Sequence, residues 1–259
     1  MKLAISGKGG AGKTLLSALL ARQFADAGYR VIAIDADPDA NLGLALGIKD
    51  SSKIKPVAEM KELIQERTGT QPGEAGLYFK INPRVDDIPD KYTVQSDGIR
   101  LLVMGRPKTG GAGCYCPENA VLSALIAHLL LSRDDVVIAD MAAGIEHLNR
   151  GTARAVDNLI AVTEPTQASI DTSKRVIKLA QELGISKISI VGNKIRSQEG
   201  KDFIANNFKE YNILGMLSFE ESVNRAEISG SLKTEASPVL KEAVYLIFKK
   251  LTSEKNRRA

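Results

Sequence analysis

Residues 2–14 read KLAISGKGGAGKT, and this stretch gives the strongest indication of the fold. Its first residues are mostly apolar and predict a buried strand, whereas residues 15–27, LLSALLARQFADA, carry apolar side chains at helical spacing. Between the two lies GKGGAGKT, residues 7–14, which fits the pattern G-x-x-x-x-G-K-[ST]. A position between a strand and a helix is the context in which this pattern indicates a phosphate-binding loop.

The loop has the chemistry that a nucleotide needs. Its glycines let successive N–H groups and the helix N-terminus face an anion. We expect Lys13 to reach the β- and γ-phosphates and the Thr14 hydroxyl to bind Mg²⁺. Lys8 places a second cation beside Lys13, and a bound phosphate would offset their repulsion. The predicted nucleotide-binding residues of the loop are Gly7, Lys8, Gly9, Gly10, Ala11, Gly12, Lys13, Thr14 and Leu15.

Short apolar runs alternate with helical patterns along the rest of the chain, which predicts an α/β fold: a P-loop NTPase with a single doubly wound, mostly parallel β-sheet flanked by helices on both faces. Expected strands are Lys2 to Ser6, Arg30 to Asp35, Arg100 to Met104, Val136 to Asp140, Leu159 to Thr163, Ile188 to Val191 and Ile213 to Leu217. Expected helices are Thr14 to Ala27, Glu118 to Leu131, Thr172 to Leu183 and Val239 to Leu251.

We expect one domain over residues 1–259, with an irregular insertion at about 49–97. This insertion is rich in Pro, Gly and Asp, with one helical piece at Val57 to Glu66. No internal repeat or low-complexity segment interrupts the chain.

Composition excludes several classes of protein. The chain has 259 residues, of which 44% are hydrophobic, enough to fill a core and to exclude dominant disorder. A net charge of +4 is too small to indicate nucleic acid as a partner. The longest apolar run, residues 120–131, is shorter than the ~20 residues of a membrane span. We therefore expect a cytoplasmic protein with neither membrane nor nucleic acid as a partner.

Two carboxylate-bearing loops follow predicted strands. Asp35, Asp37 and Asp39 come after Ile34, and Asp140 ends the run VVIAD. Ligands of open parallel sheets bind at this edge, and carboxylates there suit Mg²⁺ or a water. The predicted magnesium residues are Thr14, Asp37 and Asp140. We expect Asp39 to be a solvated charge and Asn41 to cap a helix.

Asn193, in VGNKIRS, follows another strand and is predicted to hydrogen-bond a purine. Proteins that bind guanine nucleotides usually carry the motif NKxD, whereas this chain has Arg196 in the place of that aspartate. The sequence therefore favours ATP over GTP.

Cys114 and Cys116 are the two cysteines of the chain, within GGAGCYCPENA. Pro117 is the preferred first residue of a helix, so Cys116 is expected at its N-cap, where the dipole favours thiolate. Residues i and i+2 can share one metal ion, and a two-fold dimer would complete four ligands. An ordinary pair of loop thiols is the alternative, and a strained Cys-x-Cys disulfide is a weaker one.

The loop KGG-x-GKT resembles the deviant Walker A loop of nitrogenase iron protein and of chromosome-partitioning and septum-positioning ATPases. The resemblance implies that Lys8 reaches the partner's nucleotide in an ATP-linked homodimer, that Asp37 polarises the attacking water, and that Lys8, Lys13, Asp37 and Asp140 are the catalytic residues. It further implies that the loops after Asp37 and Asp140 act as switches.

Other stretches sharpen the resemblance to one branch, the CooC-type ATPases that insert nickel during maturation of carbon monoxide dehydrogenase and acetyl-CoA synthase. The matching stretches are residues 59–69, 82–92, 110–119, 140–157 and 162–172. This branch implies Ni²⁺ or Zn²⁺ at Cys114 and Cys116, and one of these nickel enzymes as the client.

Two other functions stay open at this stage. One is a redox ATPase like nitrogenase iron protein with an intersubunit iron–sulfur cluster, although that family draws its cysteines from two distant segments. The other is a positioning ATPase acting on DNA or membrane, which would leave the segment CYCPEN unexplained. We assign no metal to His128 or His147. We expect the last helix to dock on the core, because a polar tail follows it.

Overall fold

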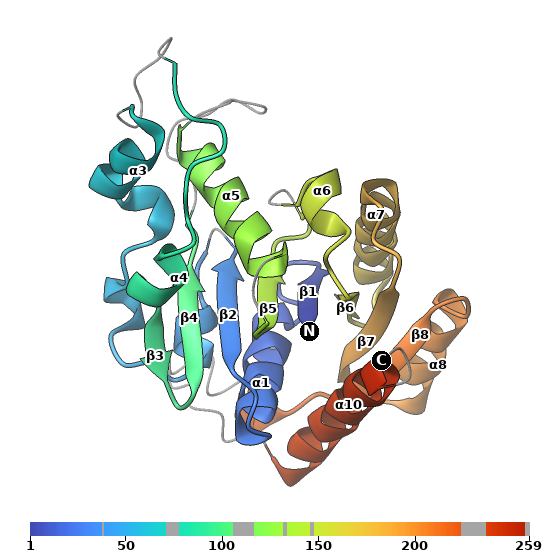
Figure 1. The fold of residues 1–259 in the computed structure, drawn as a ribbon. Coiled ribbons are helices and arrows are strands. Elements are labelled where there is room, and N and C mark those ends of the chain that lie inside the picture. The colour runs from blue at the N-terminus through green and yellow to red at the C-terminus, as the bar shows by residue number, and fades with distance from the viewer. Residues whose placement is uncertain are drawn as a thin grey trace.

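The computed structural model describes residues 1–37, 39–70, 78–105, 117–131, 134–145, 148–223 and 237–256. Within these ranges eight strands form one sheet in the order β3-β4-β2-β5-β1-β6-β7-β8, and all neighbours are parallel except the antiparallel pair β3 and β4 (Figure 1). The strands are β1 (Lys2–Gly7), β2 (Val31–Ala36), β3 (Val94–Ser96), β4 (Ile99–Val103), β5 (Val136–Met141), β6 (Asn158–Thr163), β7 (Ile188–Ile195) and β8 (Asn212–Ser218).

Helices cover both faces of the sheet. They are α1 (Lys13–Asp26), α2 (Leu42–Ala45), α3 (Lys61–Thr68), α4 (Ile88–Lys91), α5 (Pro117–Leu131), α6 (Arg150–Ala153), α7 (Gln167–Leu183), α8 (Gln198–Asn207) and α10 (Pro238–Asn256), with short 3₁₀ turns at Ser51–Lys53 and Val57–Glu59. The sheet and these helices confirm the predicted P-loop NTPase architecture.

Two apolar clusters hold the layers together. One packs α1, α2 and α10 on one face of the sheet, and the other packs α3, α4, α5, α6, α7 and α8 on the opposite face. The central strands β1, β2, β5 and β6 are buried along their whole length, since helices cover them on both sides.

All seven expected strands are present, with ends that shift by a few residues. β3 and α8 were not expected. β3 is a three-residue edge strand with no buried residue, and α8 buries Ile204 alone, so neither carries a strong apolar pattern. The expected helix from Val57 to Glu66 is instead a 3₁₀ turn followed by α3, with a break at Met60, whose φ of −83° and ψ of 76° are not helical.

The insertion is attached to the sheet through its apolar side chains. Leu63 and Ile64 of α3, together with Val85 and Ile88, belong to the same buried cluster as the neighbouring strands. Helix α3 packs against α5. Among the described polar residues between these anchors, Gln65, Glu66, Lys80 and Arg84 are exposed, whereas Thr68 and Thr70 are buried.

The C-terminal helix docks on the core, as expected. Leu240, Val244 and Ile247 are buried against α1 and β8, whereas Val239, near the start of the helix, is 65% exposed. Among the described residues, none of the helices has the length and apolar character that a bilayer span requires.

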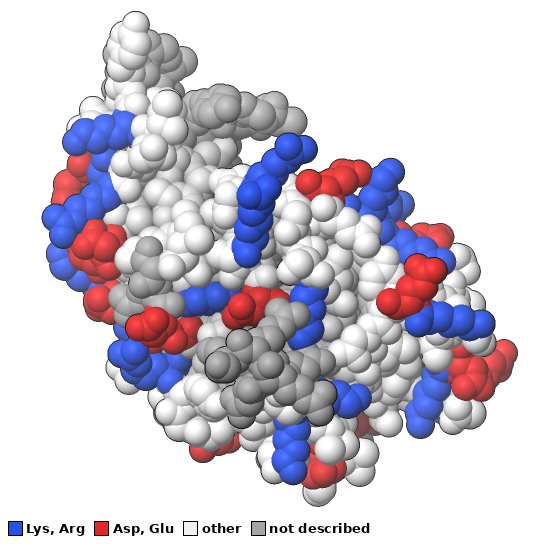
Figure 2. All heavy atoms as spheres, turned by 45° about the vertical axis from the view of Figure 1, so that its right-hand side comes forward, with Lys and Arg blue, Asp and Glu red and all other residues white. Residues whose placement is uncertain are grey.

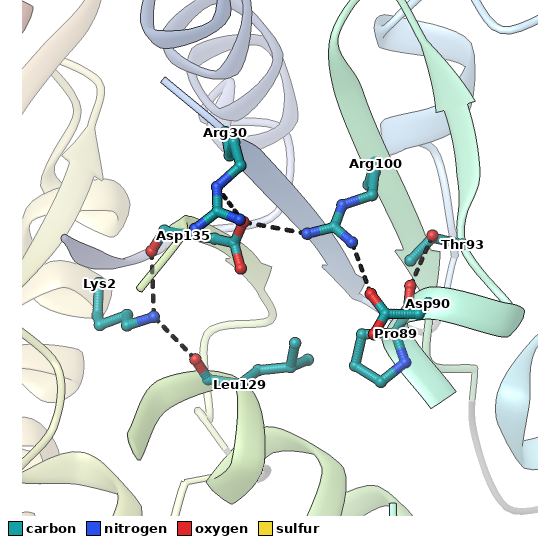
Figure 3. Close-up of polar contacts among 8 residues, drawn as sticks. All are labelled: Lys2, Arg30, Pro89, Asp90, Thr93, Arg100, Leu129 and Asp135. Atoms are coloured by element: carbon teal, nitrogen blue, oxygen red, sulfur yellow. Dashed lines mark hydrogen bonds and ion pairs between the residues drawn. The ribbon is translucent and has the colours of Figure 1, made fainter. Parts of the chain in front are cut away.

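The edge of the sheet where the parallel strands begin is tied together by a buried carboxylate (Figure 3). The Asp135 side chain is 2% exposed, and its Oδ1 lies 3.0 Å from Arg100 Nη2 and 3.7 Å from Arg30 Nε. Arg100 also bonds Asp90 Oδ1 at 2.8 Å. Lys2 Nζ donates to the backbone carbonyls of Asp135 and of Leu129 in α5. Four strands and α5 thus meet at one charged cluster.

We expect Asp135→Ala to lower the free energy of unfolding by about 3 kcal/mol, because Arg100 loses its buried ion-pair partner. Urea unfolding followed by circular dichroism measures this. Asp86→Ala is the matched control: Asp86 bonds Arg84 in an exposed pair, and water and salt screen that contact. Equal destabilisation by the two substitutions would contradict the importance of burial at Asp135.

Candidate functional site

The glycine loop between β1 and α1 has a shape that only its own residues permit. Gly7 has a φ of 155°, and a Cβ there would collide with the backbone carbonyl of Val162 in β6. Gly12 has a φ of 93°, and a Cβ there would collide with the side-chain amide of Asn193 in β7. The loop is therefore pressed against β6, which pairs with β1, and against β7, the next strand of the sheet.

The predicted phosphate-binding side chains gather at this loop. Lys13 begins α1 and is 7% exposed, and its Nζ lies 3.7 Å from Asp37 Oδ2. Thr14 Oγ1 donates to Asp140 Oδ2 at 2.6 Å. Lys8 is half-buried, and Leu15 lies in the core and also lines the cavity beside Gly12.

Two buried carboxylates lie side by side under the loop. Asp35 of β2 pairs in register with Asp140 of β5, and both are fully buried. Burial raises the pKa of Asp35 to about 7 and the pKa of Asp140 to about 6, because each anion is removed from water and repels the other carboxylates nearby. The Thr14 hydroxyl and Lys13 partly offset the shift at Asp140.

Asp35 has a role that the sequence did not reveal. Its Oδ2 accepts from Leu42 N at 2.8 Å and its Oδ1 accepts from Asp37 N at 3.3 Å. The expectation that Asn41 caps the following helix is wrong in this respect: Asn41 occupies the N-cap position, but its side chain makes no capping bond. Asp35 supplies the acceptor instead and so closes the loop that carries Asp37. Asp39 is exposed, as expected.

Mg²⁺ fits this site. Asp140 Oδ1 is buried without a hydrogen-bond partner in the described structure, although its other oxygen is used. A hydroxyl from Thr14 and a carboxylate from Asp37 complete a set of hard oxygen donors, which is the chemistry that Mg²⁺ prefers. Thr14, Asp37 and Asp140 would therefore hold the ion together with the phosphates of a nucleotide.

A small cavity lies beside the loop. It is lined by Gly12, Leu15, Asn193, Lys194, Phe219 and Val223, among others. Asn193 Nδ2 donates to the Ala11 carbonyl at 2.8 Å, so Oδ1 is the acceptor that the side chain retains. The Arg196 guanidinium stacks on Phe219 at 3.5 Å from the ring centroid. The amide thus keeps an acceptor, which matches the amino group of adenine, and a second N–H donor.

The cysteine pair, Cys114 and Cys116, and His147 lie outside the described residues. The helix after the cysteines, α5, begins at Pro117 and ends at Leu131, as predicted. His128 is half-buried within it, and its Nε2 has no hydrogen-bond partner in the described structure. In the part of the chain that the structure describes, no three His, Cys, Asp or Glu residues form a group able to hold a metal ion.

The raised pKa values predict how stability depends on pH in the protein without metal or nucleotide. Because the folded pKa of Asp35 and Asp140 lies above the unfolded value of 3.8, the folded state binds more protons between about pH 4 and pH 7. We expect the free energy of unfolding to fall across this range by a few kcal/mol, on the order of 1.4 kcal/mol per pKa unit. Urea unfolding in EDTA at several pH values measures it.

Asp35→Asn removes one of the two titrating groups, and we expect its pH profile to be flatter than that of the wild type. A rise in stability from pH 5 to pH 7 in the wild type would show that the two carboxylates stay charged in the folded protein.

A loop that presents N–H groups and a lysine to phosphates, at the carboxyl edge of a parallel sheet, places the chain in the class of P-loop NTPases. The comparisons with known proteins agree. Residues 2–233 match the family described as CobQ/CobB/MinD/ParA nucleotide binding domain. A chain of the MinC:MinD cell division protein complex of Aquifex aeolicus has the same fold, with a TM-score of 0.69, 20% identity and coverage of 98% of this chain and 96% of that one.

Two relatives are much closer in sequence. An uncharacterised ATP-binding protein of Methanocaldococcus jannaschii is 42% identical over 259 residues, which cover 99% of each chain. The carbon monoxide dehydrogenase accessory protein CooC of Rhodospirillum rubrum is 41% identical over 249 residues, 95% of this chain and 94% of that protein. The chain belongs to the CobQ/CobB/MinD/ParA family of nucleotide-binding domains, and within this family it is of the CooC type.

Proposed function

We propose that the chain is an ATP-hydrolysing metallochaperone that supports nickel insertion into carbon monoxide dehydrogenase or acetyl-CoA synthase. The observation that carries the proposal is the 41% identity to the carbon monoxide dehydrogenase accessory protein CooC, which extends over 95% of this chain. The positions of Lys13, Thr14, Asp37 and Asp140 support the ATPase half of it.

In this proposal the loop binds ATP through its phosphates. Lys13 neutralises the β- and γ-phosphates, and the buried Asp140 holds the Thr14 hydroxyl in place. Bound Mg²⁺ would neutralise developing charge on the phosphates. Asn193 would accept a hydrogen bond from the amino group of adenine.

Asp37 is proposed to orient the attacking water. Its side chain is 21% exposed, so it reaches solvent at the mouth of the loop while lying 3.7 Å from Lys13. The water oxygen bonds to the γ-phosphorus as the bond to the bridging oxygen of ADP breaks, and ADP and phosphate leave. Asp37 accepts a hydrogen bond from the water and aims its lone pair at phosphorus.

The two residues should differ in kinetics. Lys13 contacts phosphate in both the ground and transition states, so we expect Lys13→Ala to weaken ATP binding and to abolish hydrolysis. Asp37 acts on the water, so we expect Asp37→Ala to lower kcat by about 10²-fold or more with ATP affinity within about threefold of the wild type. Calorimetry and phosphate release measure the two quantities.

Asp39→Ala is the matched control, because Asp39 is an exposed carboxylate two residues away from Asp37. We expect this variant to hydrolyse ATP as the wild type does. An equal loss of ATP affinity in the Lys13 and Asp37 variants would contradict the separate roles.

The metal half of the proposal rests on sequence and relatedness. Each chain has two thiols, and Zn²⁺ or thiolate-bound Ni²⁺ commonly takes four ligands, so Cys114 and Cys116 of two copies would hold one ion between them. Lys8 would cross the same homodimer interface to the partner's nucleotide. Nickel is here the cargo, delivered to the client enzyme.

Metal titration tests this arrangement. We expect one Ni²⁺ or Zn²⁺ per two chains, a dimer stabilised by metal even without nucleotide, and weaker binding at low pH as the thiolates protonate. Any effect of a non-hydrolysable ATP analogue on metal affinity must equal the effect of metal on affinity for the analogue. Calorimetry and sedimentation velocity measure stoichiometry and association.

Cys114→Ser and Cys116→Ser should lose metal binding and keep ADP affinity. One metal per chain, or tight binding in both variants, would overturn the shared site. A brown chromophore after anaerobic purification would instead support the redox ATPase, and stimulation of hydrolysis by DNA or lipid vesicles would support the positioning ATPase.

The proposal names no nucleic acid and no membrane as a partner, and it places the chain in the cytoplasm. The net charge of +4 is too small to indicate nucleic acid as a partner. Figure 2 agrees, since Lys and Arg side chains are interspersed with Asp and Glu over the face that is drawn.

A further inference from the structure

Strand β7 holds the phosphate loop through two consecutive side chains. Asn193 Nδ2 donates to the Ala11 carbonyl at 2.8 Å, and Lys194 Nζ donates to the Gly10 carbonyl at 2.7 Å. The sequence predicts a role for Asn193 at the base and none for Lys194. Two successive carbonyls of the loop are thus tied to a strand more than 180 residues away.

One peptide group of the loop is held by hydrogen bonds on both sides, one of them from Lys194. The carbonyl of the Gly10–Ala11 peptide accepts from Lys194, while its N–H closes a turn onto the Lys8 carbonyl at 3.1 Å. Because a trans peptide is planar, with its N–H and C=O pointing in opposite directions, the two bonds together set the orientation of this unit. The next peptide, held by Asn193, turns the Gly12 N–H away from β7 in the same manner.

Lys194 is aimed at the loop by its backbone and by Glu164. Its φ of 56° is left-handed, a conformation that side chains other than glycine seldom adopt. Its Nζ lies 3.0 Å from Glu164 Oε1, at the end of β6. The lysine is 39% exposed and the glutamate 16% exposed. An ion pair this open to water contributes little to stability on its own, so its effect is to orient the ammonium group.

The charge of Lys194 also suits a loop that already carries Lys8 and Lys13. A charged donor makes a stronger hydrogen bond to a carbonyl than a neutral one. Glu164 neutralises this third cation, so that it adds no repulsion to the two lysines that face the phosphates.

We propose that Lys194, oriented by Glu164, is a positioning residue that holds the phosphate loop in its nucleotide-binding shape before the nucleotide arrives. The inference rests on the proposed nucleotide site. A preformed loop favours the phosphates in the ground state and the transition state alike, so losing the contact raises KM for ATP and Kd for ADP and leaves kcat nearly unchanged.

The test compares Lys194→Met, which keeps the length of the side chain and removes its charge, with Lys201→Met on the exposed surface of α8 as the matched control. We expect Kd for ADP and KM for ATP to rise about tenfold or more in Lys194→Met, as the loss of a charge-assisted hydrogen bond predicts, and to stay unchanged in the control. Lys194→Arg, which keeps a charged donor, should recover most of the affinity.

Tripolyphosphate separates the loop from the base cavity, because it has no base. Its inhibition constant against ATP should rise by the same factor as Kd for ADP. Glu164→Gln should raise both by a smaller factor, and should have no further effect in the Lys194→Met background, because Glu164 acts through the lysine.

Unchanged ADP and tripolyphosphate affinities in folded Lys194→Met would overturn the inference. A loss of ADP affinity with unchanged tripolyphosphate inhibition would also overturn it, because the effect would then lie at the base.

Thermal unfolding of each variant identifies a general folding defect. If Lys194→Met has such a defect, Kd for ADP and the inhibition constant of tripolyphosphate in Lys194→Arg and Glu164→Gln test the inference instead. A wild-type chain that binds neither ADP nor tripolyphosphate would instead overturn the proposed nucleotide site.

Discussion

The structure depends on a costly arrangement at the carboxyl edge of three neighbouring strands. The register of β2 against β5 puts Asp35 beside Asp140, and the pairing of β5 with β1 brings both under the phosphate loop. Two carboxylates buried side by side are unfavourable unless donors and cations surround them. The backbone N–H groups of Leu42 and Asp37, the Thr14 hydroxyl and Lys13 supply part of this compensation. A bound magnesium ion would supply a further positive charge, so the two buried carboxylates favour a divalent cation at this edge.

The sequence predicted the sheet because its central strands are mostly apolar, as Val31–Ala36 illustrates: every residue of this strand is buried and only Asp35 is charged. It predicted the phosphate loop because the loop is a local feature, with spacing and flanking elements that lie within a dozen residues. β3 and α8 could not be predicted in this way. Apart from Ile204 their residues are exposed or half-buried, and these elements depend on a partner strand or a neighbouring layer that local periodicity does not reveal.

Contacts between distant segments set the finer details of the site. Asn41 has the residue type of a helix cap, yet its side chain makes no capping bond, and Asp35 of β2 accepts instead from Leu42 N at the start of the helix. The sequence predicted no role for Lys194, and the packing of β7 against the loop shows that its ammonium group donates to the Gly10 carbonyl. Residue type and spacing predicted most of the site residues, whereas the hydrogen-bond partner of each side chain depended on the assembled sheet.

The collision that a Cβ at Gly12 would make with the amide of Asn193 has a consequence for redesign. Asn193 donates to the Ala11 carbonyl and lines the neighbouring cavity, so in the proposed nucleotide site a single planar group would both close the loop and contact the base. A variant engineered to accept a different nucleotide could not exchange Asn193 alone. It would need a replacement that restores a donor to the Ala11 carbonyl within the narrow gap above Gly12, which leaves few residue types and couples nucleotide choice to the integrity of the loop.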